Sequence, residues 1–174
     1  MGESYCIECG VAGVEVRPVP SGAFVCLGCL STYSKQWISR HFPKGSEKAE
    51  AAVDIALTKM GMSHNEMPCS TLVVTSFPEA KLPEGVATQW KSKKIDRIDR
   101  DKVTKGDLIF FISDDGQGRI NHVGIVVGVK EDGTIYFVHA SLSKGVIIST
   151  TKQIGGYGKS TWGQLIHGFG RVKE

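Results

Sequence analysis

Five cysteines divide this chain into a small N-terminal part and a larger remainder. Four of them form two Cys-x-x-Cys pairs, Cys6 with Cys9 and Cys26 with Cys29, and 16 residues lie between the pairs. Two tight turns that each present two sulfurs can surround one tetrahedral ion, so this spacing predicts a structural zinc site. Two disulfides are the alternative, which a cytosolic start would disfavour. A metal would hold together a segment too short to form its own core.

The next expected boundary lies shortly after the second cysteine pair. Apolar residues recur at helical spacing from Leu30 to His41, which predicts a helix, and Pro43 and Gly45 then interrupt the pattern. We therefore expect a zinc-ribbon-like module over residues 1–43 and a second domain over residues 44–174.

Charge and hydropathy exclude several classes of protein. The 174 residues include 21 Lys and Arg against 18 Asp and Glu, and 41% are hydrophobic. This balance leaves no basic footprint for nucleic acid, and no apolar run is long enough to span a bilayer. The segment Met1–Cys6 lacks the basic and apolar regions of a secretory signal. We therefore expect cytoplasmic synthesis without a signal peptide and neither a nucleic-acid nor a membrane partner.

The second domain combines helices with a run of strands. Ser46 is a candidate N-cap for a helix that ends near Gly61. Residues 69–77 have β-branched side chains typical of a strand, but Pro68 before them and Pro78 after them favour a short buried helix. Residues 79–105 are expected to be irregular, with Trp90 as an anchor and alternating charges over residues 91–105. Strands are expected over residues 107–113, 122–129, 134–140, 145–150 and 168–172.

The fifth cysteine, Cys69, is a candidate nucleophile. A helix that begins at Cys69 would place its thiol beside the positive end of the helix dipole, which favours thiolate. His122 and His139 lie on two expected strands and could supply the base and a group that orients it. His64, five residues before Cys69, could line the same site, although a surface position is the simpler interpretation.

The proposed pair of histidines requires a particular strand register. If Gly128 faces Gly133, His122 lies directly opposite His139, and their Cβ atoms are roughly 4.5–5.5 Å apart. A tighter turn would instead pair His139 with Val126 and separate the histidines by about 13 Å.

Four motifs in this order resemble the NlpC family of cell-wall cysteine peptidases, also called the NlpC and p-sixty family. They lie within residues 46–172 and are Pro68-Cys69-Ser70-Thr71-Leu72-Val73, Lys105-Gly106-Asp107-Leu108-Ile109-Phe110-Phe111, His122-Val123-Gly124-Ile125-Val126-Val127-Gly128, and Phe137-Val138-His139-Ala140-Ser141 with Gly145-Val146-Ile147-Ile148. The resemblance implies a papain-like α+β fold in which a helix that carries the cysteine packs on an antiparallel sheet.

The same resemblance implies a reaction and roles for its residues. Cys69 would be the nucleophile, His122 the general base and acid, and His139 the orienting group, while the Cys69 N–H would contribute to the oxyanion hole. The substrate would be an amide of the peptidoglycan stem peptide, commonly between D-glutamate and diaminopimelate, with Ser70 and His64 as candidate substrate contacts. No cofactor would be needed for catalysis.

This chain departs from the family pattern beside its cysteine. Pro68 stands where the family usually has Asp, and Thr71 stands where it usually has Gly. The tyrosine often found upstream is absent, so Ser63 or His64 would have to replace it. The Asp–Ser pair helps some members to recognise a free stem-peptide amine, so its loss affects the expected substrate preference.

Several hypotheses follow for the biological role. Without a signal peptide, a wall hydrolase would reach the periplasm or cell wall by non-classical export or by lysis, as antibacterial effector toxins and phage lysins do. A secretion-apparatus component and a cognate inhibitor protein are then candidate partners. The alternatives are a papain-like acyltransferase or isopeptidase acting on protein or lipid, and a non-enzymatic zinc-ribbon adaptor.

Overall fold

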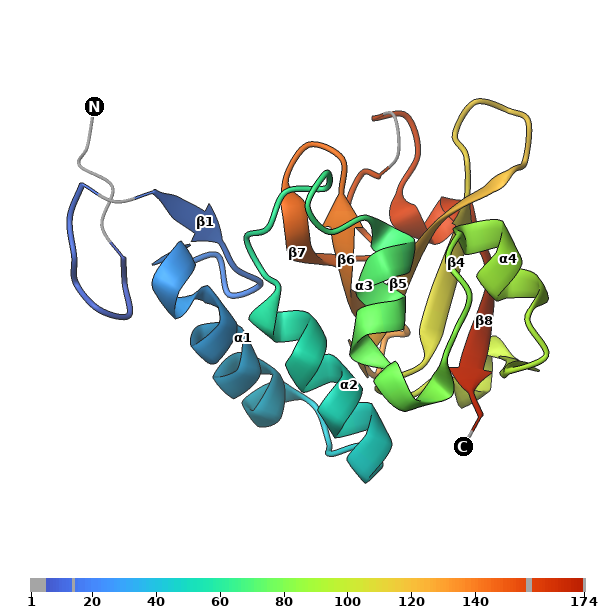
Figure 1. The fold of residues 1–174 in the computed structure, drawn as a ribbon. Coiled ribbons are helices and arrows are strands. Elements are labelled where there is room, and N and C mark those ends of the chain that lie inside the picture. The colour runs from blue at the N-terminus through green and yellow to red at the C-terminus, as the bar shows by residue number, and fades with distance from the viewer. Residues whose placement is uncertain (1–5, 14, 156–157, 174) are drawn as a thin grey trace.

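A six-stranded antiparallel sheet forms the body of the protein, with strand order β3-β8-β4-β5-β6-β7 (Figure 1). The computed structural model describes residues 6–13, 15–155 and 158–173. Residues 1–5, where no secretory signal was expected, lie outside the described residues. The strands are β3 (Ile95–Ile98), β4 (Leu108–Ile112), β5 (Ile120–Val129), β6 (Ile135–Ser141), β7 (Gly145–Thr150) and β8 (Ile166–Val172).

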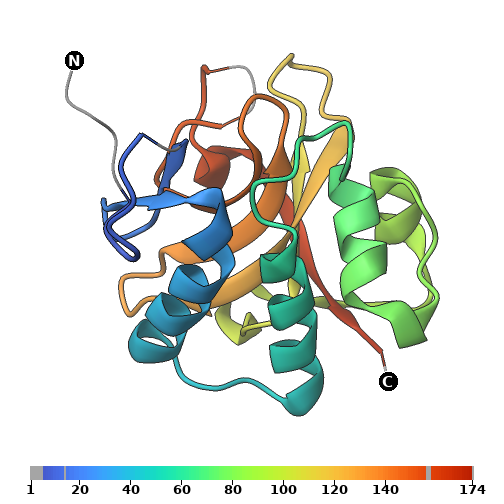
Figure 2. The same ribbon diagram turned by 60° about the vertical axis from the view of Figure 1, so that its left-hand side comes forward.

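Helices α1 (Leu27–His41), α2 (Glu47–Thr58) and α3 (Cys69–Ser76) cover one face of this sheet (Figure 2). Alternation along β5 explains the packing, because Val123, Ile125 and Val127 all point to the helices and are fully buried. The opposite face has its own apolar core around Phe111 and Phe137, against which Trp162 of the 3-10 helix η3 (Trp162–Leu165) packs. The expected α+β fold is therefore confirmed.

The two helices predicted in the second domain are present. α2 begins after Ser46, whose hydroxyl accepts a hydrogen bond from the Ala49 N–H at 3.2 Å, as an N-cap does. α3 begins at Cys69, so the helical interpretation of residues 69–77 is confirmed over the strand. The five predicted strands are also present, each within about two residues of its expected ends.

The expectation of an irregular segment over residues 79–105 is wrong. This segment contains the helix α4 (Val86–Lys91), the edge strand β3 and two short 3-10 helices, η1 (Pro78–Ala80) and η2 (Arg100–Lys102). These elements are short, and β3 pairs only with β8, which lies roughly 70 residues further along the chain. Tertiary pairing rather than local periodicity creates the strand, so the sequence carries little signal for it.

The N-terminal residues form a two-stranded hairpin of β1 (Val16–Pro18) and β2 (Phe24–Cys26), which leads directly into α1. A small separate core surrounds Cys6, Val25 and Leu30 at this end of α1. The other end of α1 reaches the main core, where Trp37 and Phe42 pack on Tyr136 of β6. α1 thus packs both in the small N-terminal core and in the core between the helices and the sheet. The domain boundary expected after residue 43 stays a prediction.

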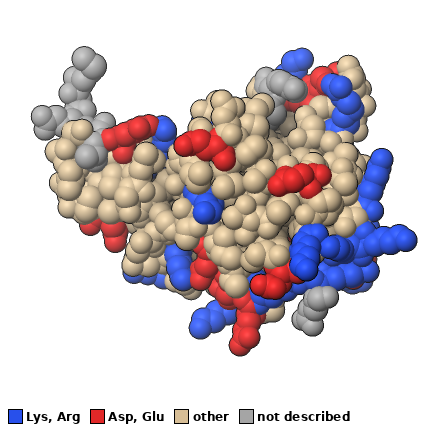
Figure 3. Space-filling view, in the orientation of Figure 1, with Lys and Arg blue, Asp and Glu red and all other residues tan. Residues whose placement is uncertain are grey.

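Charged side chains of both signs lie on the face shown in Figure 3, and basic ones gather toward the C-terminal end. Near the C-terminus and before β4, Lys173 pairs with Asp96 at 3.0 Å and Lys102 with Asp99 at 3.3 Å. Among the described residues, none of the helices is both long and apolar enough to cross a membrane.

The contact between Phe42, the residue after α1, and Gly128 of β5 gives a test of how the N-terminal module is attached. A Cβ atom at Gly128 would lie 2.1 Å from the Phe42 ring, so we expect Gly128→Ala to lower the free energy of unfolding by about 1–3 kcal/mol through overpacking. In a Phe42→Ala background, the same change should be nearly neutral because the obstructing ring is gone. Urea denaturation of the four proteins measures this coupling, and simple additivity would contradict it.

Candidate active site

Cys69, His122 and His139 come from three different elements and meet at one end of the sheet. Cys69 is the first residue of α3, His122 lies near the start of β5, and His139 lies near the end of β6. Cys69 and His122 share a pocket of about 290 Å³. Its other lining residues are His64, Pro68, Ile112, Ser113, Asp114, Asn121, Ser141, Leu142, Ser143 and Trp162.

The two histidines are in direct contact. His122 Nε2 lies 2.7 Å from His139 Nδ1, and the ring planes are nearly perpendicular, at 85°. Trp162 stacks on the His122 ring with the centroids 5.0 Å apart. The sequence analysis did not identify Trp162, although Thr161-x-x-Gln164 is a capping-box pattern that fixes the short helix carrying it.

Neither of the two registers considered from the sequence is the observed one. β5 and β6 pair Ile125 with Val138 and Val126 with Phe137, so this register places His139 opposite Gly124 and makes His122 its diagonal neighbour. Long side chains can still meet across such a diagonal. The expectation that the two histidines lie directly opposite each other is therefore wrong, while their contact is present.

The turn between these strands and a bulge beyond it determine the register. The Lys130 N–H donates to the Thr134 carbonyl, which leaves the three-residue loop Glu131-Asp132-Gly133, with Gly133 at a φ of 82°. A three-residue hairpin loop commonly ends with glycine in this left-handed region. An irregularity between Val126 and Gly128 then shifts the pairing by one further residue.

Burial raises the pKa of the Cys69 thiol, although N–H groups of Val123, Ser70 and Cys69 itself act in the opposite direction. The net pKa is therefore raised, contrary to the expectation that the helix terminus would favour thiolate, because desolvation outweighs these hydrogen bonds. The contact with Val123 places the sulfur next to the residue that follows His122. The structure records no hydrogen bond between the sulfur and the His122 ring, and such bonds are often long without substrate.

Both imidazoles are held neutral. Desolvation lowers the pKa of His122 to about 3, and the charge of His64 adds to this effect. The pKa of His139 is also lowered well below its usual value, first by burial and then by the charges of His122 and Lys144. A neutral thiol and a neutral imidazole fit general-base catalysis, in which the proton moves as the sulfur attacks.

The two candidate substrate contacts have different surroundings. His64 is among the residues that line the pocket, so a substrate contact by His64 stays a prediction. Ser70 is not among its lining residues; its hydroxyl lies 3.4 Å from Glu84, which also accepts from the Thr71 hydroxyl at 3.2 Å. Ser70 and Thr71 thus share an acidic partner outside the pocket.

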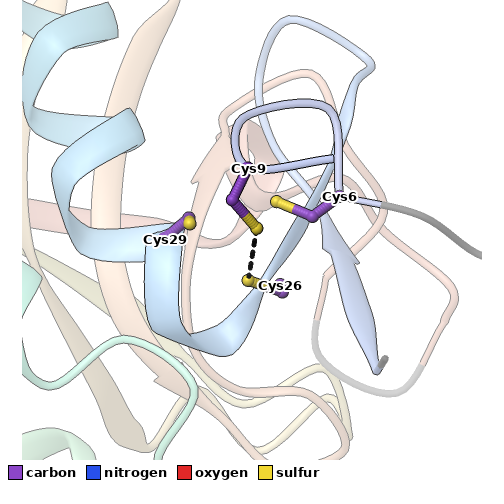
Figure 4. Close-up of side chains that lie close together, drawn as sticks. All are labelled: Cys6, Cys9, Cys26 and Cys29. Atoms are coloured by element: carbon purple, nitrogen blue, oxygen red, sulfur yellow. Dashed lines mark hydrogen bonds between the residues drawn. The ribbon is translucent and has the colours of Figure 1, made fainter. Parts of the chain in front are cut away.

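The four N-terminal cysteines come together as predicted (Figure 4). All four sulfurs lie within 4.8 Å of one another, and none of these cysteines forms a disulfide. Cys6 and Cys9 belong to one turn, while Cys26 ends β2 and Cys29 lies in the first turn of α1. The Cys9 and Cys26 sulfurs are 3.8 Å apart, which matches the edge of a tetrahedron with Zn–S bonds of about 2.3 Å.

The protonation of these thiols also fits a cation site. Backbone N–H groups, that of Cys26 foremost, lower the pKa of Cys6 to about 6. Hydrogen bonding to Cys26 and Cys9 raises the pKa of Cys29 to about 12. Crowded sulfurs cannot all ionise without a compensating positive charge, and a bound Zn²⁺ would supply it. Cys6, Cys9, Cys26 and Cys29 would hold the ion, whose role there would be structural.

The raised pKa of Cys69 predicts slow alkylation at neutral pH. Because the thiolate is the reactive form, we expect iodoacetamide to modify Cys69 more slowly than a free cysteine at pH 7, with a rate that still rises above pH 9. Peptide-level mass spectrometry distinguishes Cys69 from the other four cysteines. A rate that reaches its plateau below pH 7 would show that the thiol is instead ionised.

The cysteine cluster predicts one bound zinc ion per chain. Removal of the metal by a chelator should lower the melting temperature, because the ion links the Cys6–Cys9 turn to the start of α1. Elemental analysis should find less zinc in Cys26→Ser, whereas Cys69→Ala, the matched control, should keep its zinc. Unchanged zinc content in Cys26→Ser would contradict the assignment.

Comparisons with known proteins agree with this geometry. The family model described as NlpC/P60 family matches residues 59–165, which is more than half of the chain. The chain is 34% identical over 97 residues to the probable endopeptidase NlpC of Escherichia coli. It is 28% identical over 139 residues to the probable endopeptidase NlpC homolog of Haemophilus influenzae. These matches cover 54% and 78% of this chain, but only 58% and 61% of the two relatives.

Solved structures share the fold at low sequence identity. An NlpC/P60 family protein from Bacillus cereus matches with a TM-score of 0.56 and 20% identity, over 76% of this chain and 42% of that one. A Staphylococcus aureus protein described as similar to lipoprotein of the NLP/P60 family matches with a TM-score of 0.54 and 20% identity, over 93% of this chain and 57% of that one. From the family match, the contacts at its site and these shared folds, we conclude that the chain belongs to the NlpC/P60 family.

Proposed function

We propose that this protein is a cysteine endopeptidase that hydrolyses an amide bond in peptidoglycan stem peptides. The observation that carries the proposal is the 2.7 Å contact between His122 and His139, at a pocket that His122 shares with a thiol at the start of a helix. This arrangement supplies a nucleophile, a base and an orienting group. The names of the two curated relatives, both probable endopeptidases, support a peptidase.

The reaction would begin with proton transfer from Cys69. His122 uses Nε2 for the contact with His139, which leaves Nδ1 to accept the thiol proton as the sulfur attacks the scissile carbonyl. Free N–H groups in the first turn of α3 would stabilise the oxyanion that forms. His122 would then return the proton to the leaving amine, and water would hydrolyse the thioester and release Cys69.

The pocket supports a short peptide as substrate more than a polyanion. Its lining is apolar at Pro68, Ile112, Leu142 and Trp162, and it contains neither Lys nor Arg. We propose the bond between D-glutamate and diaminopimelate as the target, as the family resemblance implies. The enzyme would then act in the periplasm or cell wall, and the zinc module over residues 1–43 would be a docking element for a partner.

Digestion of purified peptidoglycan tests the activity. We expect the protein to release new peptide fragments, detectable by mass spectrometry, and Cys69→Ala and His122→Ala to be slower by about 10³-fold or more. His167→Ala is the matched control, because the exposed side chain of His167 in β8 packs against Trp90 outside the candidate site, and this variant should retain activity.

Two results would reject this proposal. One is the absence of new fragments with the wild-type protein, and the other is equal release by Cys69→Ala. An acyl-enzyme that forms at Cys69 with a lipid or protein substrate, but not with muropeptides, would instead favour an acyltransferase or isopeptidase.

A further inference from the structure

His139 has a second polar contact, which lies on the side away from His122. Its Nε2 is 2.8 Å from the hydroxyl oxygen of Ser149 in β7. In the register of β6 and β7, Phe137 faces Ser149 and His139 faces Ile147, so the serine is a diagonal neighbour of the histidine on the same face. Both residues are nearly inaccessible, with His139 1% and Ser149 5% exposed.

The three side chains therefore form one hydrogen-bonded row, from His122 through His139 to Ser149. A neutral imidazole carries one N–H, which can sit on either nitrogen. In each contact of this row, one residue donates the hydrogen bond and the next accepts it. This direction decides which nitrogen of His122 remains free to act as a base.

Only one direction is compatible with the reaction proposed above. When His122 takes the proton of Cys69, both of its nitrogens become donors, so His139 Nδ1 must be able to accept from His122 Nε2. The single proton of His139 must then sit on Nε2, where Ser149 Oγ accepts it. The opposite direction would bring two N–H groups together across a 2.7 Å contact.

The surroundings hold the His139 ring in this row. Phe137 and Trp162 contact it with centroid distances of 4.8 and 5.1 Å, which opposes rotation of the ring. Ser149 and His139 both line a second, larger pocket of about 790 Å³. Water in that pocket can accept the serine hydroxyl proton, so the serine can serve as an acceptor for His139.

We infer that Ser149 is a positioning residue that fixes the tautomer of His139 and, through it, the free nitrogen of His122. Ser149 acts through His139 and does not touch the substrate. This inference rests on the proposed function for its kinetic consequence, but the tautomer itself can be measured without any substrate.

Nitrogen-15 NMR of the histidine rings is the direct test. In the wild-type protein, we expect both His122 and His139 as the Nε2–H tautomer. Ser149→Ala should convert His139 to a mixture of tautomers, whereas Ser149→Thr, which keeps the hydroxyl, should restore the wild-type spectrum. Ser76→Ala is the matched control, because it removes a buried hydroxyl that donates only to the Leu72 carbonyl.

Kinetics on peptidoglycan fragments provide the second measurement. Ser149→Ala should lower kcat about tenfold, or roughly 1.4 kcal/mol in activation free energy, with KM nearly unchanged. Ser149→Thr should recover most of the rate. Melting temperatures of the variants would identify any loss of activity that comes from unfolding.

The outcomes separate the two proposals. An unchanged His139 tautomer in folded Ser149→Ala would overturn the role of Ser149, and so would an unchanged kcat. If the wild-type protein leaves peptidoglycan intact while the tautomers change as expected, the proposed substrate is wrong and the positioning role of Ser149 stands.

Discussion

The contact between His122 and His139 depends on how two neighbouring strands pair, and much of the site follows from that pairing. A hairpin loop of three residues and a bulge near Val127 place the two rings on a diagonal. A shift of one residue would turn His139 to the other face of the sheet, among the helices. The bulge is therefore as important for the site as the histidines themselves, because it determines whether they can meet.

A second consequence of this pairing is that aromatic side chains surround both rings, while His122 keeps an edge in the pocket. On the face of the sheet that carries the histidines, Phe111 and Phe137 lie beside them and Trp162 of the 3-10 helix η3 packs over them. These rings help to desolvate both imidazoles, and desolvation lowers both pKa values. On the opposite face, α3 presents the Cys69 thiol at the same end of the sheet. The site thus lies where the two hydrophobic cores of the domain meet.

The sequence predicts the elements of this fold better than the distances between them. Helical spacing and a serine N-cap identify α2, and the prolines on either side identify α3, because these signals are local. The register of β5 and β6 depends on a bulge that no residue type in the sequence predicts. The edge strand β3 is formed by its pairing with β8, which is distant in the sequence. Cys69 appears activated when the helix dipole is considered alone, and only the packed structure reveals how strongly burial opposes it. Ser149 and Trp162 are ordinary residues in the sequence, and their positions beside His139 arise from tertiary contacts.

The burial of Cys69 has a consequence for the chemistry of the resting protein. Peroxides attack the thiolate form of cysteine, and the products beyond the sulfenic acid are largely irreversible. A thiol whose pKa is raised by burial offers little of the thiolate that oxidants attack at neutral pH. In the proposed reaction, Cys69 would keep its proton until His122 accepts it as the sulfur attacks a substrate carbonyl, so the same desolvation that delays ionisation would preserve the sulfur.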